Sequence, residues 1–424
     1  MKKLFLLSIL GILLFAPPLK AQEIVLTLDE ALSLAVRNNR SILLKAEDVL
    51  KAKAKIKEAQ AGLLPSLDLA AGWQDLRELY SKDVGTYSAG AGITQTLYAS
   101  GKVINAVKIS EYNYFASQAV LDTVKLDTIA EVKKAFYTLG LSEQFAEINK
   151  GIVENTREHI DFMQARFEQG QSSESEIIAM RSSLVNAQQA YEVSLNQKEA
   201  AEALLINLLS FDKEVKIRAN DPLICEPKDI AYEEAFLEAM QRRPEIRQLE
   251  AQQKSAKRAV SVARSGGQPS VLASWDYYSS SRTSFGSFAT PGGKGWNDYN
   301  MIAITASWPI FDGWLTKSKV DQALIDLKEA QLLKDKKSKD IALEIKSSYL
   351  DLKSAVTNIK STEEQVRVFK DGLFVMQAKY SAGTTSLLDL HDAKLSHQVA
   401  LFNQVSAQYD YLMAKARFDR ATGG

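Results

Sequence analysis

The chain has 424 residues, with 52 basic and 52 acidic side chains and therefore no net charge at pH 7. This balance argues against nucleic acid as a partner, because nucleic-acid-binding proteins concentrate positive charge on one surface. The single cysteine, Cys225, excludes a disulfide within the chain.

The first predicted element is a cleaved secretory signal at residues 1–21. Two lysines precede the apolar run from Leu4 to Ala16, and the small residue Ala21 stands at the expected cleavage point. The run is too short for a stable membrane span. No later apolar run reaches about 18 residues, so we expect no helical membrane anchor, and a bilayer would have to be crossed by strands.

The mature chain is predicted to be an internal duplication, with a first repeat at residues 22–209, a linker at 210–229 and a second repeat at 230–424. LTLDEALSLAVRNN in the first repeat matches IAYEEAFLEAMQRR in the second at a spacing of 204 residues. Farther on, Gly170 recurs as Gly383 at a spacing of 213. Such fixed spacings indicate duplication rather than chance composition.

Each repeat is predicted to begin with two short helices. Thr27 and Glu30 have the spacing of a capping box at the start of the first. Pro244 suits the first position of a helix in the second repeat. Gly62 and Gly266 are expected to end the helix pairs in a left-handed conformation, since a proline follows each one three residues later.

A strand hairpin is predicted next in each repeat, at about 66–97 and about 270–310. In the first, Leu67, Leu69 and Trp73 alternate with polar or small residues, and the second hairpin repeats the pattern. Strands of about ten residues with this alternation and with aromatic side chains are typical of transmembrane barrels. A soluble pair of hairpins is the alternative.

Long helices follow both hairpins. They are predicted from Lys102 to Glu168 and from Trp314 to Ser381, in stretches without proline. Turns at about 168–174 and about 381–387 then reverse the chain into helices predicted at Glu174–Leu209 and Ser386–Arg420. Helices of this length need neighbours along their whole extent, as in a coiled coil or a helical tube.

In this doubled order of elements the chain resembles the TolC-like outer membrane efflux proteins. LYASG at 97–101 and PIFDGW at 309–314 are similar to the strand-to-helix junctions of the family, and KYSAGTTSLLDLHDAK at 379–394 is similar to its periplasmic tip. The resemblance covers nearly the whole mature chain. It implies a mainly helical homotrimer in which each subunit gives four strands to a 12-stranded transmembrane β-barrel, continued by a periplasmic α-helical barrel.

The implied function is that of an outer-membrane exit duct in a tripartite efflux or type I secretion system of a Gram-negative cell. Outer-membrane lipid surrounds the barrel, an inner-membrane transporter supplies the energy, and a periplasmic adaptor contacts the tips. Conduction itself is passive. The alternative is a periplasmic coiled-coil adaptor or scaffold, which would share the signal and the long helices. Two hairpins joined to long helices favour the channel.

The resemblance also assigns roles to residues of the tip. Adaptor-docking turns are implied at Gly170, Gln171, Ser172, Ser173, Gly383, Thr384 and Ser386, although ordinary turn chemistry also explains these residue types. In the family an acidic residue, a tyrosine and an arginine close the tip. Glu168 and Tyr380 match the first two, whereas Thr385 stands where the arginine would be.

A periplasmic constriction is predicted at Asp389 and Asp392. They are three residues apart on a predicted helix and so share one face. The resemblance places that face in the lumen. The alternative is that acidic residues near a helix start offset the helix dipole.

We predict no catalytic residue, cofactor or metal site. The three histidines are His159, His391 and His397, and no Cys/His cluster has the spacing of a metal site. Although Asp389, His391 and Asp392 are close in sequence, no nucleophile accompanies them. An enzyme is therefore the least supported class.

Overall fold

A computed structural model describes residues 22–79, 82–170, 173–211, 215–220, 223, 225, 232–284 and 296–424. The predicted signal at residues 1–21 and part of the predicted linker lie outside this range. So do Gln171 and Ser172 of the first tip turn.

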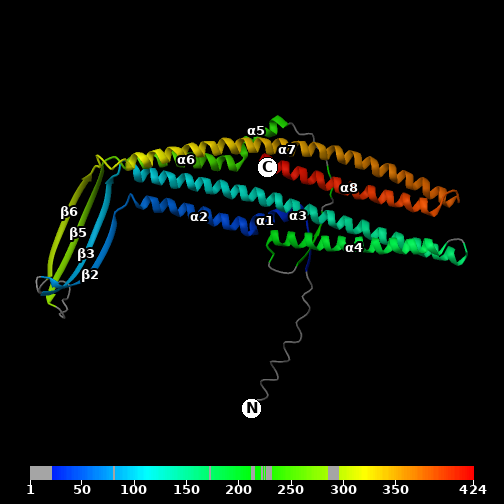
Figure 1. Cartoon of the computed structure of the whole chain (residues 1–424), viewed down its shortest axis with the longest axis horizontal. Helices are drawn as coiled ribbons and strands as arrows, with labels where there is room; N and C mark the ends of the chain where they lie inside the picture. Colours follow the sequence, from blue (N-terminus) through cyan, green and yellow to red (C-terminus); the bar gives the residue numbers. More distant parts are fainter. Residues whose placement is uncertain are drawn as a thin grey trace, which may run out of the picture. The chain divides into compact units, whose positions relative to one another are not determined.

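In each repeat of the chain two short helices, two strands and two long helices follow one another (Figure 1). In order, the described elements are β1 (Gln22–Leu26), α1 (Leu28–Asn38), α2 (Arg40–Ala61), β2 (Ser66–Leu79), β3 (Lys82–Tyr98), α3 (Lys102–Glu168), α4 (Glu174–Leu209), β4 (Val215–Ala219), α5 (Tyr232–Arg242), α6 (Pro244–Ser265), β5 (Ser270–Ser284), β6 (Trp296–Ser307), α7 (Leu315–Ser381) and α8 (Leu387–Thr422). No helix among the described residues is long and apolar enough to span a membrane.

The described chain forms two compact units, and each draws on both sequence repeats. The first combines segments within Met1–Leu43, Val124–Arg242 and Ile341–Gly424, and the second combines Leu44–Thr123 with Arg243–Asp340. The helices α3 and α7 run from one unit into the other.

The predicted starts of the short helices are confirmed. At α1 the Thr27 hydroxyl accepts a hydrogen bond from the Glu30 amide, and the Glu30 carboxylate accepts one from the Thr27 amide at 2.9 Å. Pro244 is the first residue of α6. These contacts satisfy amide groups that a helix start otherwise leaves unpaired.

The predicted left-handed glycines at the ends of α2 and α6 are wrong. Gly266 has a right-handed φ of −63°, and Gly62 is not among the glycines with positive φ. Both helices end instead in tight turns, with the Gly62 amide donating to the Ala59 carbonyl. Space at Gly62 is tight, because a Cβ built there would lie 3.1 Å from a methyl group of Val103.

The two predicted hairpins form one antiparallel sheet in the second unit, with strand order β2-β3-β5-β6. The register aligns Leu67, Ile93, Trp275 and Ile302 across all four strands. Directly paired residues point to the same face, so this row is apolar throughout. Leu67 is 66% exposed and Ile302 is 80% exposed.

The opposite face of the sheet carries many small or polar residues, although Met301 also lies there. Its neighbouring row consists of Asp68, Gly92, Asp276 and Met301. A Cβ on Gly92 would meet a carboxylate oxygen of Asp276 at 2.9 Å, so the glycine leaves room for that side chain. The sheet thus has one row that is apolar on all four strands beside a row with acidic and small residues, which agrees with the alternation in the sequence.

Consecutive left-handed residues connect each hairpin to its long helix. Ser100 and Gly101 have φ values of 50° and 77°, and Gly313 and Trp314 have 64° and 69°. Left-handed backbone is costly for residues other than glycine, and it turns the chain sharply at this point. The helix α7 therefore begins at Leu315, one residue later than predicted.

A small parallel sheet in the first unit was not predicted. The strand β1 pairs with β4, from Gln22 beside Val215 to Leu26 beside Ala219. Part of the predicted irregular linker is therefore a regular strand. Side chains of the two strands pack into an apolar core with residues of α1, α3 and α4, namely Leu26, Ala31, Ala35, Val132, Ala135, Phe136, Leu139, Ala201, Leu205, Leu209 and Ile217.

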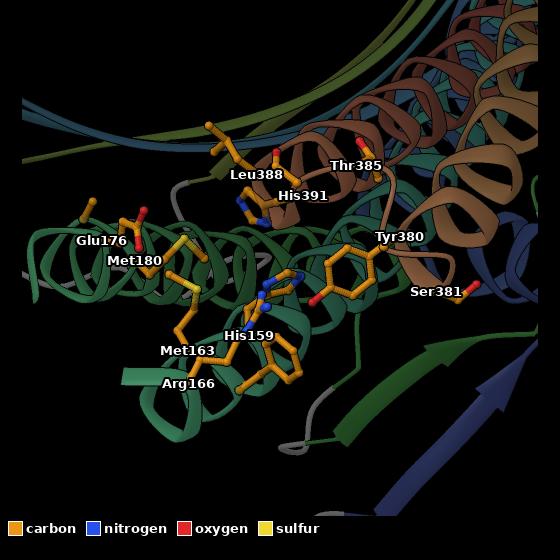
Figure 2. Close-up of a pocket in the computed structure, with 14 residues that line it drawn as sticks. His159, Met163, Arg166, Glu176, Met180, Tyr380, Ser381, Thr385, Leu388 and His391 are labelled. Carbon is orange, nitrogen blue, oxygen red and sulfur yellow. The ribbon is translucent and has the colours of Figure 1, made fainter. Parts of the chain in front are cut away.

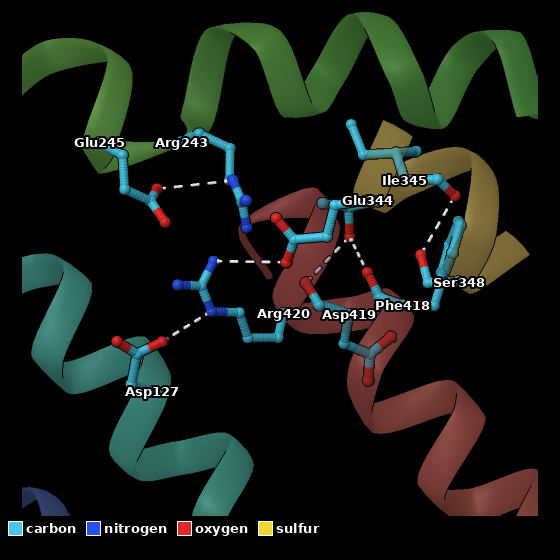
Figure 3. Close-up of polar contacts among 10 residues, drawn as sticks. Asp127, Arg243, Glu245, Glu344, Ile345, Ser348, Phe418, Asp419 and Arg420 are labelled. Atoms are coloured by element: carbon cyan, nitrogen blue, oxygen red, sulfur yellow. Dashed lines mark hydrogen bonds and ion pairs between the residues drawn. The ribbon is translucent and has the colours of Figure 1, made fainter. Parts of the chain in front are cut away.

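Ion pairs join the long helices of the first unit near the C-terminal end of α8. The Arg420 guanidinium donates to the Asp127 carboxylate of α3 at 2.7 Å and lies 4.0 Å from the Glu344 carboxylate of α7 (Figure 3). Lys133 of α3 pairs with Asp419 of α8 at 3.1 Å. These contacts hold α3, α7 and α8 in register within this unit.

Candidate functional site at the helical tip

Glycine allows the chain to reverse at the end of each long helix. Gly170 after α3 and Gly383 after α7 have φ values of 70° and 72°. In the second turn the Thr384 amide donates to the Lys379 carbonyl at 3.0 Å. Such bonds are typical of a helix that ends in a left-handed residue. No atom lies within 4 Å of a Cβ built on either glycine, so only the backbone conformation selects glycine here.

Both returning helices begin with a capping box. The hydroxyl and amide of Ser173 exchange hydrogen bonds with Glu176 at the start of α4, and those of Ser386 do the same with Asp389 at the start of α8. Ser173 and Ser386 are duplicates at the 213-residue spacing. The sequence carries the signal for this cap, a serine followed three residues later by an acidic residue.

The two predicted constriction residues have different environments. Asp389 Oδ2 accepts hydrogen bonds from the Ser386 hydroxyl at 2.6 Å, the Thr385 hydroxyl at 3.0 Å and the Ser386 amide at 3.1 Å. The bonds from Ser386, and then the one from Thr385, hold the pKa of the Asp389 carboxyl below its usual range. Asp392 is exposed. The helix-capping alternative thus describes the contacts of Asp389.

The three predicted closure residues do not meet within the subunit. Thr385 bonds to Asp389, while Tyr380 packs edge-on against Phe162 with ring centres 6.3 Å apart. Glu168, the last residue of α3, is exposed, and in the described part of the chain no hydrogen bond or ion pair joins it to Tyr380 or Thr385.

Arg166 is a residue of the tip that the sequence pattern did not indicate. The Arg166 guanidinium lies 5.6 Å from the centre of the Phe162 ring. Arg166 and Tyr380 line the same cleft. Arg166 belongs to the first repeat, whereas the family pattern places its arginine in the second, so the pattern gave no sign of Arg166.

A cleft of about 740 Å³ opens between the ends of α3 and α7 and the starts of α4 and α8 (Figure 2). Its lining comes from all four helices and comprises His159, Phe162, Met163, Arg166, Glu176, Ala179, Met180, Tyr380, Ser381, Gly383, Thr385, Ser386, Leu388 and His391. All of these residues belong to the first unit. The cleft brings together Tyr380, Gly383, Thr385 and Ser386 from the predicted tip but leaves out Glu168, Asp389 and Asp392.

Two histidines meet in this cleft. The rings of His159 and His391 stand edge to face with centres 5.3 Å apart. His159 is only 7% exposed, and burial, followed by the charges of Lys394 and His391, lowers the pKa of its imidazole to about 4. The ring of His159 is therefore neutral at physiological pH. More than 200 residues separate the two histidines, so sequence spacing carries no sign of their contact.

The described residues contain no group of three or more His, Cys, Asp or Glu side chains placed to hold a metal ion. The third histidine, His397, does not line the cleft. Cys225 donates a hydrogen bond to the Gln408 carbonyl, and burial raises the pKa of its thiol to about 11, which makes it a poor nucleophile.

Comparison with known proteins gives a consistent result. The model of the family described as outer membrane efflux protein matches residues 31–210 and 236–424. Outer membrane protein TolC of Escherichia coli (strain K12) is 24% identical over 420 residues, covering 91% of this chain and 80% of that protein.

The fold is similar to those of solved outer membrane channels. The CmeC channel of Campylobacter jejuni has a TM-score of 0.79 at 18% identity, covering 93% of this chain and 85% of that one. The open state of the MtrE channel of Neisseria gonorrhoeae has a TM-score of 0.78 at 20% identity, covering 94% of this chain and 89% of that one.

Proposed function

Because the chain belongs to the outer membrane efflux protein family, we propose that three copies of it assemble into an exit duct of a tripartite efflux or type I secretion system. An inner-membrane transporter delivers the substrate, a periplasmic adaptor docks at the helical tips, and conduction through the outer membrane is passive. The family is one of channels, and the adaptor alternative is not favoured.

The main support for this proposal comes from the open edges of the four-stranded sheet. In the described part of the chain, β2 and β6 each pair on one side only. An unpaired edge is too costly in lipid, because its amide and carbonyl groups have no water to bond. Four strands are also too few to close on themselves. Three copies joined edge to edge give the 12 strands of the predicted barrel.

Exposed apolar side chains on the long helices agree with this assembly. Leu343 and Phe374 of α7 are 70% and 72% exposed in the single chain. Exposed apolar surface along a helix marks contact with a partner. In the trimer, α7 meets neighbouring subunits along a helical tube.

Trimer formation is tested on the protein extracted from membranes in detergent. Native mass spectrometry is expected to give three copies, and planar bilayers are expected to show a conducting pore. A monomer that stays in solution without detergent and forms no pore would refute the duct and return the chain to the class of periplasmic adaptors.

We place adaptor docking at the two tip turns, around Gly170, Ser173, Gly383, Thr384 and Ser386, together with Gln171 and Ser172 outside the described residues. A photo-crosslinking amino acid at Ser173 or Thr384 should capture the adaptor in intact cells. The same probe at Lys57, an exposed residue of α2, is the control. If the adaptor is captured equally at all three positions, it does not dock specifically at the tip turns.

We place the periplasmic constriction at Asp389 and Asp392, closed further by Tyr380 and Glu168, with Thr385 in the position of the family arginine. Three subunits would bring six carboxylates together, and such a ring favours cations. In single-channel recordings, changing both to Asn should lower cation selectivity and weaken block by a trivalent cation from the periplasmic side.

Asp29→Asn provides the control for that substitution, since Asp29 is an exposed acid in the first turn of α1 and lies outside the tip. It should leave selectivity unchanged. If the double variant keeps the parent's selectivity and block, Asp389 serves only to cap α8.

A further inference from the structure

Basic side chains gather where the helices of the second unit meet the sheet. The segments 53–65, 99–110, 257–269 and 308–319 hold the four junctions between helix and strand (Figure 1). They contain ten lysines and arginines but only two acidic residues, although the whole chain is neutral. Nine of the ten basic residues are exposed. We call these ten residues the basic collar.

The excess of positive charge is confined to this end of the helices. Farther from the sheet, residues 244–256 of α6 carry two basic and two acidic side chains, and residues 320–340 of α7 carry five of each. Exposed lysines that only keep a helix soluble are ordinarily mixed with acidic residues along its length. The concentration of one charge at one end therefore points to a negatively charged partner there.

Contacts between the helix ends make the basic collar one surface. The turn that follows α2 lies beside Val103 of α3. The Arg258 guanidinium of α6 donates to the side-chain oxygen of Asn105 in α3 at 3.5 Å. A Cβ built on Gly267, after α6, would lie 3.2 Å from the methyl group of Thr316 in α7. Because all these residues belong to the second unit, its four basic segments adjoin one another.

Large apolar side chains mark the level of the membrane surface at the same place. Between β6 and the first turn of α7, Trp308, Ile310, Phe311 and Trp314 are 64% to 88% exposed. The ammonium group of Lys317 lies 5.3 Å from the centre of the Trp314 ring. Tryptophan is enriched where a bilayer meets water, and long basic side chains extend from that level to the polar layer. The basic collar therefore begins at the depth of the lipid headgroups.

The distances along the helices fit an interaction with headgroups. Lys57 and Lys53 lie four and eight residues before Ala61, the last residue of α2, which corresponds to about 6 and 12 Å along the helix. The headgroup layer on each side of a bilayer is about 5–8 Å thick. The potential of a charged leaflet extends about 8–10 Å farther, so both lysines lie within its reach.

We propose that the basic collar binds anionic phospholipids of the periplasmic leaflet through their phosphate groups. The long helices continue from the barrel into the periplasm, so the junctions face this leaflet of the outer membrane. Ammonium and guanidinium groups donate hydrogen bonds to phosphate oxygens and balance their charge. The bound lipids fix the depth of the barrel in the membrane. This interaction needs neither the adaptor nor the transporter.

The test uses the full-length protein purified in an uncharged detergent. It is titrated with phosphatidylglycerol, or with phosphatidylcholine of the same acyl chains, and native mass spectrometry counts the bound lipids. We expect phosphatidylglycerol to bind at least about fivefold more tightly. Raising ammonium acetate from about 0.1 M to about 1 M should reduce this preference, because the Debye length falls from about 10 Å to about 3 Å.

A quadruple substitution removes charge from the basic collar. This collar variant carries Lys53→Gln, Lys57→Gln, Lys257→Gln and Lys319→Gln. In the described part of the chain no hydrogen bond or ion pair involves these four exposed side chains, and glutamine has nearly the helix propensity of lysine. The variant should therefore fold as the parent does by circular dichroism, and its preference for phosphatidylglycerol should fall by about fivefold or more.

The control variant removes the same charge elsewhere. It carries Lys336→Gln, Lys339→Gln, Lys353→Gln and Lys360→Gln, at four exposed positions of α7. Even Lys336 lies 21 residues after Leu315, about 30 Å along the helix and beyond the reach of the headgroups. The control variant should bind both lipids as the parent does. An equal loss of preference in both variants would overturn the proposal, because the effect would then follow total charge.

Other outcomes also decide against the basic collar as a lipid site. A parent that binds phosphatidylcholine as tightly as phosphatidylglycerol would overturn the proposal, as would an unchanged preference in the folded collar variant. In planar bilayers, a changed ion selectivity of the collar variant with an unchanged lipid preference would place these charges inside the duct instead. The mass of the protein in the same spectra reports the number of subunits, so failure of the proposed trimer is seen separately.

Discussion

Replacing Gly383 by alanine tests how the second tip turn is made. The φ of Gly383 is 72°, and no atom lies within 4 Å of a Cβ built there. Any destabilisation therefore comes from the backbone and not from a clash. Gly372, nine residues before the end of α7, also has open space around a Cβ built there, but it has a helical conformation. Comparing Gly383→Ala with Gly372→Ala therefore isolates the free-energy cost of the left-handed backbone conformation.

The two substitutions are expected to change stability in opposite directions. A left-handed conformation costs a residue other than glycine about 1–2 kcal/mol, so Gly383→Ala should destabilise the turn by that amount. Gly372→Ala should stabilise α7 by about 0.5–1 kcal/mol, because alanine loses less conformational freedom than glycine in a helix. The two variants should therefore differ by about 1.5–3 kcal/mol, which is about a tenfold to hundredfold change in a local opening equilibrium.

Hydrogen exchange measured by mass spectrometry on the intact protein reports that equilibrium for peptides around residues 378–390. Exchange should be faster in Gly383→Ala and no faster than in the parent in Gly372→Ala. The corresponding pair in the first repeat is Gly170→Ala with Gly151→Ala as its control. If both members of a pair exchange alike, left-handed strain is not what selects glycine at the tip.

Three further outcomes are expected. Phe136→Ala in the first unit's core should lower stability by about 3–5 kcal/mol, seen as a lower melting temperature; a loss below about 1 kcal/mol would contradict this. Gly62→Ala should destabilise the protein, because the new methyl group would crowd a methyl group of Val103, and Val103→Ala should relieve this loss. If the double variant is no more stable than Gly62→Ala, that explanation is wrong. Stability at the tip should fall as the pH falls from 6.5 toward 4, because His159 binds a proton in the unfolded chain at a higher pH than in the folded protein. The loss of stability has an upper limit of about 3 kcal/mol. Hydrogen exchange at the tip should lose this pH dependence in His159→Gln.

Much of the architecture could be predicted because its signals are local. The structure has α3 at Lys102–Glu168 and α4 at Glu174–Leu209, as predicted, since Gly170 marks the turn between them. Alternation over ten residues was likewise enough to assign the strands and the apolar face that contains Leu67 and Ile302.

What could not be predicted depends on contacts between distant parts of the chain. The pattern of glycine before proline does not distinguish a left-handed turn from a close approach, and Gly62 lies in a tight space beside Val103. The strand β4 gains its regularity only from β1. The cleft likewise unites His159 with His391 through the packing of separate helices.

The pairing of β1 with β4 bears on how the protein is made. Gln22 pairs with Val215, about 190 residues later in the chain, so the hydrogen bonds between β1 and β4 can form only after β4 has been synthesised. The first unit also needs Ile341–Gly424, so its assembly cannot finish until the chain has been delivered completely. Until then the first unit is incomplete, and partly assembled chains of this kind expose apolar surface that favours aggregation.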